Sequence, residues 1–143
     1  MQANSAVNPS FSFDQTYVIQ QADALASLLS STNTTSSNYY ISLDSGWNIG
    51  DHGDDNGRII YDDTRFDIPA LAQHVHSQGR KLGVYMLSGS FANDGDKTIL
   101  GTDILIRDTW SRNNNWFARM DFDFEKEGVQ EWHDSVVDLF AEW

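Results

Sequence analysis

Two short apolar runs separated by one amphipathic segment constrain the fold of this chain more than any other feature. Residues Tyr39–Leu43 and Lys81–Leu87 each have the length and apolar content of a buried strand. Between them, Asp67 can cap a helix with Pro69 in its first turn and Gly79 just past its end. Its inner face would consist of Ile68, Leu71, Ala72 and Val75. A strand, a helix and a second strand in this order require a crossover connection, which makes the strands parallel. The pattern therefore predicts an α/β fold with a parallel sheet.

The rest of the chain supplies further elements of the same kinds. Ser12 and Gln15 have the spacing of a capping box, which predicts a helix that runs to about Leu29. A short apolar run predicts a third strand at 103–108, and residues 117–124 are expected to be a strand or an extended loop. The last helix is expected from about residue 126 to the end.

Composition excludes several classes of protein. The chain has 143 residues, a net charge of −12 and only 9 Lys and Arg residues, which do not cluster. A nucleic-acid-binding protein needs a basic patch, so no nucleic acid is expected as a partner. No apolar run is long enough to span a membrane, and without cysteines the chain has no Cys-ligated zinc site. The acidity is consistent with an uncharged substrate.

The candidate site lies where the two strongest strands end. The first strand runs directly into Asp44, Ser45, Gly46 and Trp47, and Tyr85 lies near the end of the other. In α/β barrels, functional residues gather at the carboxyl ends of the strands. Carboxylate, hydroxyl and indole groups together suit a carbohydrate, since aromatic faces match the C–H faces of a sugar ring.

The aspartate-rich segments invite comparison with calcium sites. In segment 51–57, placing Gly57 sixth in an EF-hand loop puts His52 first, and placing Asp51 first puts Asn56 sixth, so neither register fits. A solvated turn is therefore the favoured interpretation there and at Asp94 and Asp96. No metal site and no cofactor is expected. Asp44 and Asp108 are the only carboxylate pair that strand ends offer for glycoside hydrolysis.

Several stretches resemble the melibiases, the α-galactosidases and relatives of glycoside hydrolase family 27. The resemblance covers most of residues 12–143, and its most specific run is His76-Ser77-Gln78-Gly79-Arg80-Lys81-Leu82-Gly83-Val84-Tyr85. Further stretches that carry it are Tyr40–Trp47, Asn56–Arg58, Thr64–Phe66, Asp121–Phe124 and Ala141–Trp143.

The resemblance implies a (β/α)₈ TIM barrel, of which residues 1–143 would form an N-terminal fragment with roughly the first three βα units. It implies retaining hydrolysis of an α-glycoside, with both catalytic aspartates beyond Trp143, so that no catalytic residue is assigned here and the isolated chain is expected to be inactive. Asp44, Ser45, Trp47 and Tyr85 match positions that bind substrate. Ser45 stands where the family has a second aspartate, which makes galactose an uncertain substrate.

Other interpretations remain open at this stage. The chain could be a non-catalytic carbohydrate-binding α/β protein that uses the same aromatic residues, or a calcium-dependent module built on residues 51–55. An incomplete barrel would expose strand edges, which predicts marginal stability or self-association. A glycosylation sequon at Asn33 would fit a secreted protein, although residues 1–5 lack the features of a signal peptide.

Overall fold

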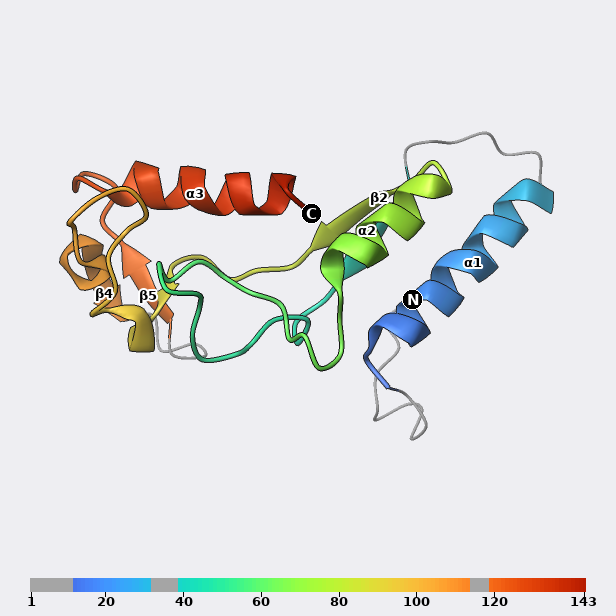
Figure 1. Ribbon diagram of the computed structural model, residues 1–143, viewed down its shortest axis with the longest axis horizontal. Coiled ribbons are helices and arrows are strands. Elements are labelled where there is room, and N and C mark those ends of the chain that lie inside the picture. Colours follow the sequence, from blue (N-terminus) through green and yellow to red (C-terminus); the bar gives the residue numbers. More distant parts are fainter. Residues whose placement is uncertain (1–11, 32–38, 114–118) are drawn as a thin grey trace. The chain divides into compact units, whose positions relative to one another are not determined.

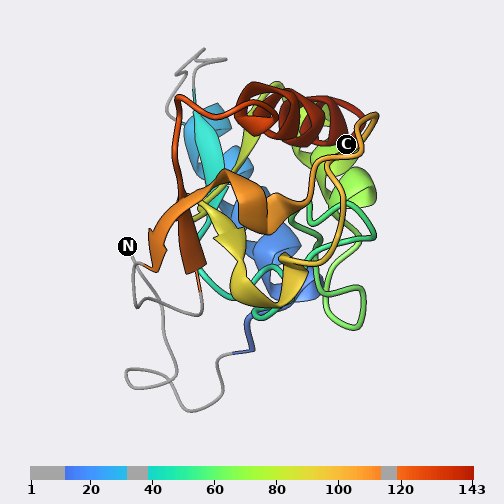
Figure 2. The ribbon, with the colours of Figure 1, turned by 90° about the vertical axis from the view of Figure 1, so that its left-hand side faces the viewer.

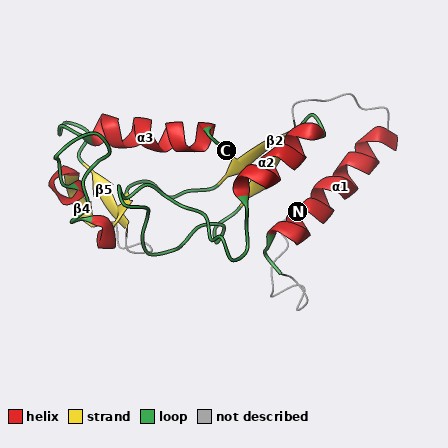
Figure 3. Ribbon diagram, in the orientation of Figure 1, coloured by secondary structure: helices red, strands yellow, loops and turns green. Residues whose placement is uncertain are grey.

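The computed structural model describes residues 12–31, 39–113 and 119–143, which divide into two compact units. The first unit comprises residues 1–47 and 62–85, and the second comprises residues 48–61 and 86–143. The first unit contains α1 (Gln15–Ser31), β1 (Tyr40–Leu43), α2 (Ile68–Ser77) and β2 (Lys81–Val84). The second contains β3 (Ser90–Phe91), the 3-10 helices η1 (Ala92–Asp94) and η2 (Ile106–Thr109), β4 (Trp110–Asn113), β5 (Arg119–Phe122) and α3 (Val129–Ala141) (Figure 3).

The first unit is built on a strand–helix–strand arrangement. β1 and β2 form a parallel pair in which Tyr40 lies opposite Lys81 and Leu43 lies opposite Val84. α2 connects the two strands and packs on β2, and α1 packs on α2 (Figure 1). The predicted α/β class and the parallel pairing are confirmed, although the second strand ends at Val84 and not at Leu87.

The predicted features of α2 are all present. The Asp67 carboxylate accepts a hydrogen bond from the Ala70 backbone N–H at 3.0 Å, and Pro69 lies in the first turn. The buried face of α2 consists of Ile68, Leu71, Ala72 and Val75. Gly79, just past the helix, has a φ of +72°, which is the left-handed conformation expected there.

α1 begins differently from the prediction. The Tyr17 backbone N–H donates to the Asp14 carboxylate at 2.9 Å, so Asp14 caps the helix and the predicted capping box at Ser12 is wrong. The Ser12 hydroxyl instead donates to Asp14, and this bond, followed by the one from Tyr17, lowers the pKa of Asp14. A carboxylate is a stronger acceptor than a hydroxyl at the positive end of a helix, which favours Asp14.

The second unit contains an antiparallel sheet, which the sequence pattern did not predict. β5 lies between β3 and β4 and is antiparallel to both (Figure 2). The expected strand at 103–108 is wrong, because Thr98 bridges Leu105 across a turn and the chain then enters η2. The extended conformation expected within 117–124 is confirmed for β5.

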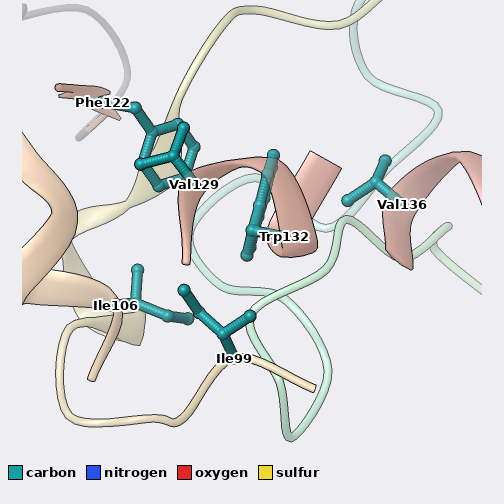
Figure 4. Close-up of a cluster of buried hydrophobic side chains, with 6 residues drawn as sticks. All are labelled: Ile99, Ile106, Phe122, Val129, Trp132 and Val136. Carbon is teal, nitrogen blue, oxygen red and sulfur yellow. The ribbon is translucent and has the colours of Figure 1, made fainter. Parts of the chain in front are cut away.

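The core of the second unit surrounds one face of α3. Trp132 is 1% exposed and lies at the centre of a cluster of buried apolar side chains (Figure 4). Its other members are Ile99, Ile106, Phe122, Val129 and Val136. Phe122 packs against the indole with a centroid separation of 4.7 Å, so β5 and α3 share this core.

We expect Trp132→Ala to lower the free energy of unfolding by about 3–5 kcal/mol, because it leaves a large cavity in this cluster. Trp132→Phe should cost less, since it keeps a ring and removes an indole N–H that is buried without a hydrogen-bond partner among the described residues. Val137→Ala on the exposed side of α3 is the control and should stay within about 0.5 kcal/mol of wild type. Denaturant titration measures all three, and equal losses for Trp132→Ala and Val137→Ala would contradict the assignment of the core.

Candidate functional site

The parallel pairing brings the ends of β1 and β2 to the same edge of the sheet. The Tyr85 backbone N–H donates to the Leu43 carbonyl at 2.8 Å, which extends the pairing one residue beyond β2. The next residues after Leu43 are therefore neighbours of Tyr85, as the sequence predicted. This edge is the carboxyl end of the parallel pair, where α/β folds place ligands.

Three of the four candidate residues present polar groups to solvent at this edge. Asp44 and Ser45 are exposed, and the Tyr85 side chain is 46% exposed. The Ser45 backbone N–H donates to the Asp44 carboxylate at 2.7 Å, which restrains the orientation of that carboxylate. A carboxylate, a hydroxyl and a phenol can together accept and donate hydrogen bonds to a polyhydroxylated ligand.

The fourth candidate, Trp47, lies inside the first unit. Its side chain is 0% exposed, and its indole N–H donates to the Tyr85 carbonyl at 2.6 Å. The indole therefore joins the two strand ends from within and does not offer its face at the surface. Local sequence could not show this orientation, because a Trp that follows a strand can point either way.

A turn at 62–66, for which the sequence pattern indicated no role in the site, supports this edge. The Arg65 guanidinium donates to the Gly46 carbonyl at 2.5 Å and to the Asp62 carboxylate at 2.8 Å. The Asp62 backbone N–H in turn donates to the Trp47 carbonyl at 3.0 Å. Hydrogen bonds from the Thr64 and Arg65 side chains lower the pKa of Asp62, in that order of effect.

The remaining candidate carboxylates have structural roles in the second unit. Asp108 lies in η2 and not at the end of a strand, so its expected place at a strand end, which made it a candidate partner of Asp44, is wrong. Asp94 is completely buried, where it forms an ion pair with Lys97 at 2.6 Å and accepts the Gly53 backbone N–H at 2.8 Å. The expectation of a solvated turn is therefore wrong for Asp94, whereas Asp96 is exposed and forms an ion pair with Arg107.

The aspartate-rich loop is held by its own side chains. The Asp54 carboxylate accepts hydrogen bonds from the backbone N–H groups of Asn56 and Arg58 and from the Arg58 guanidinium, at 2.8–2.9 Å. Lys97 donates to the carbonyls of Gly53 and Asp54. Within the described ranges, no group of three or more His, Asp or Glu side chains is placed to hold a metal ion.

Comparison with known proteins identifies the family. Residues 6–129 match the melibiase model described as Alpha galactosidase A. The chain belongs to this family. A curated relative, Alpha-galactosidase 3 of Hypocrea jecorina, is 50% identical over 102 residues, which are 71% of this chain and 16% of the relative. The chain thus spans about a sixth of the length of this family member.

Solved structures share the fold. A β-L-arabinopyranosidase of glycoside hydrolase family 27 from Geobacillus stearothermophilus, in complex with arabinose, matches with a TM-score of 0.77 at 23% identity. The wild-type form of that enzyme gives the same TM-score at 24% identity. Each match covers 92% of this chain and 37% of the enzyme, so the chain corresponds to just over a third of that length.

Two sequence expectations bear on where the protein is found: the glycosylation sequon and the absence of a membrane-spanning segment. Asn33 lies outside them, so the sequon has no structural setting here. Across residues 12–31, 39–113 and 119–143, every helix falls short of the length and apolarity that a membrane crossing requires.

We expect the supporting turn to respond to acid through Asp62. Because hydrogen bonding lowers its pKa in the folded chain, Asp62 stabilises the fold above its unfolded pKa of about 3.9, and this contribution is lost as the pH falls through the folded pKa. The Gly46 and Trp47 amide resonances should therefore shift with a midpoint below the ordinary aspartate range. Asp62→Asn should remove this transition, and Asp63→Asn should keep it; a midpoint at or above the ordinary range would contradict the assigned hydrogen bonds.

Proposed function

We propose that this chain forms the substrate-holding part of a retaining glycoside hydrolase of the α-galactosidase type. The observation that carries the proposal is the cluster of exposed polar side chains at the carboxyl edge of the β1–β2 pair in a chain of this family. The relative named Alpha-galactosidase 3 and the arabinose complex of the β-L-arabinopyranosidase support a carbohydrate as the partner.

The architecture we propose for this part is an incomplete (β/α)₈ barrel of roughly three βα units. The β1–α2–β2 arrangement supports it, since parallel strands joined through a helix are the repeating unit of such a barrel. In this proposal the antiparallel β3–β5–β4 sheet is an excursion from the repeat and not part of the barrel wall.

The four candidate residues have different roles in the proposed site. Asp44 accepts hydrogen bonds from two sugar hydroxyls, and Ser45 and Tyr85 supply further hydrogen bonds from the same edge. Trp47 shapes the site from inside by fixing the Tyr85 backbone. Because Ser45 is neutral where the family resemblance leads one to expect an aspartate, the site binds a galactoside or a related glycoside with one carboxylate fewer.

Hydrolysis in this proposal depends on groups outside residues 1–143. A retaining glycosidase needs two carboxylates about 5 Å apart, one as nucleophile and one as general acid and base. We assign neither role to Asp44, which holds the sugar ring in place. The chain contributes binding and orientation, which convert the attack on the glycosidic bond into a reaction between positioned groups.

Binding is tested by titrating the chain with D-galactose and L-arabinose while the amide resonances are followed. Three or four hydrogen bonds at a solvent-exposed edge support a dissociation constant of about 1 mM, with shifts centred on Asp44, Ser45 and Tyr85. Asp44→Ala should abolish these shifts, whereas Asp108→Ala, in η2 of the second unit, should preserve them. Shifts that are absent from this edge, or that survive Asp44→Ala, would refute the proposed site.

The same titration distinguishes the proposed function from the alternative, a non-catalytic carbohydrate-binding protein. A self-sufficient carbohydrate-binding protein would bind its sugar about a hundredfold more tightly than the partial site that we propose, since its pocket would be complete. Tight binding of one sugar would therefore favour a carbohydrate-binding protein over the proposed part of a hydrolase.

We expect no turnover of an aryl α-galactoside by the 143-residue chain, because the proposal places both catalytic carboxylates elsewhere. Release of the aryl group is followed by absorbance, with Asp44→Ala as the matched variant. Turnover by wild type that Asp44→Ala abolishes would show that the chain is itself a hydrolase.

A further inference from the structure

The exposed edge at Asp44 and Ser45 is a turn that needs support. Gly46 has a φ of +97°, in the left-handed region where glycine has unusual freedom. Asp44 and Ser45 come immediately before this glycine. Whatever fixes the Gly46 peptide therefore also fixes where Asp44 and Ser45 present their side chains.

One side chain holds that peptide from outside the turn. The Arg65 terminal nitrogen donates to the Gly46 carbonyl at 2.5 Å, while its Nε donates to the Asp62 carboxylate at 2.8 Å. The carboxylate orients the guanidinium, so the donor meets the carbonyl in a fixed direction. Arginine suits this task because its planar group can serve two acceptors at once.

The backbone at Arg65 and at Asp67 is anchored as well. The Arg65 carbonyl accepts the Gln15 backbone N–H at 3.0 Å, and the Gln15 side chain accepts the Asp67 backbone N–H at 2.6 Å. Asp67 is the residue that caps α2. The Arg65 backbone is thus linked through Gln15 to the starts of α1 and α2, which restrains the point from which the guanidinium extends.

We propose that Arg65 is a positioning residue of the carbohydrate site: by holding the Gly46 carbonyl it fixes the turn that presents Asp44 and Ser45. This inference rests on the proposed function of that edge. The proposed role of Arg65 does not include contact with the sugar: it rests on the hydrogen bonds from Nε to Asp62 and from a terminal nitrogen to Gly46.

The test compares D-galactose binding by wild type, Arg65→Gln, Arg65→Lys and Asp62→Asn. Losing a charge-assisted hydrogen bond that fixes the turn should weaken binding about tenfold in Arg65→Gln. Arg65→Lys should recover part of the affinity, because it keeps a cationic donor but not the fork. Asp62→Asn leaves the guanidinium in place without its orienting carboxylate and should give an intermediate loss, which keeps the test usable if Arg65→Gln does not fold.

Arg58→Gln is the matched control. Arg58 also forms an ion pair with a nearby loop aspartate, Asp54, at 2.8 Å, but in the second unit. The Arg58→Gln variant should leave galactose binding unchanged. In the absence of sugar, the Ser45 and Gly46 amide resonances should move in the Arg65 and Asp62 variants and stay fixed in the control, a signature that a general loss of stability does not produce.

The outcomes separate the two levels of inference. If wild type does not bind galactose, the proposed function fails and the positioning role fails with it. If wild type binds and the folded Arg65→Gln and Asp62→Asn variants bind equally well, only the positioning role is overturned. Loss of binding with unchanged Ser45 and Gly46 resonances would also overturn it.

Discussion

The parallel pairing of β1 with β2 is the interaction on which the site depends. Each strand has only four residues, and the hydrogen bond from Tyr85 to the Leu43 carbonyl continues their ladder to the point where the polar residues begin. The crossover through α2 makes this pairing possible, since parallel strands cannot be joined by a tight turn. The Trp47 indole then links the two strand ends from inside the unit, because its N–H donates to the carbonyl of Tyr85, 38 residues away in the sequence.

Sequence reasoning succeeded where local signals and tertiary packing agree. For α2, the cap at Asp67, the apolar face and the glycine past its end all indicate the same helix, and the structure has it. At the start of α1 the capping-box pattern indicated Ser12, whereas the structure has Asp14 as the cap, because the pattern takes no account of the stronger acceptor two residues on.

The antiparallel sheet could not be predicted because two of its three strands, β3 and β4, lack the local pattern of strands. β3 has two residues, and β4 is polar and interrupted by a shift in register between Trp110 and Arg112. What holds this region together is non-local. The Trp110 indole N–H donates to the buried Ser90 hydroxyl, and the buried Arg119 guanidinium donates to the Gly89 carbonyl and lies 3.8 Å from the Phe91 ring centre.

The buried charged residues of the second unit also depend on contacts that local sequence does not indicate. Burial lowers the pKa of Arg119 to about 10, and Asp94 opposes this shift, so the guanidinium remains charged at neutral pH. An aspartate within Asn93-Asp94-Gly95 has the composition of a surface turn. When buried, it is paired with Lys97, three residues on, and with the backbone N–H of Gly53, which is 41 residues away and which local sequence does not indicate.

The candidate site combines residues that support the turn with residues that are exposed on it, and this difference has an evolutionary consequence. Trp47 and Arg65 hold the frame, whereas Asp44 and Ser45 project from it into solvent. Exposed side chains can be exchanged at little cost in folding free energy, while a fully buried indole cannot. For the site proposed above, this means that substrate preference can change through the exposed pair without a compensating change in the scaffold beneath it.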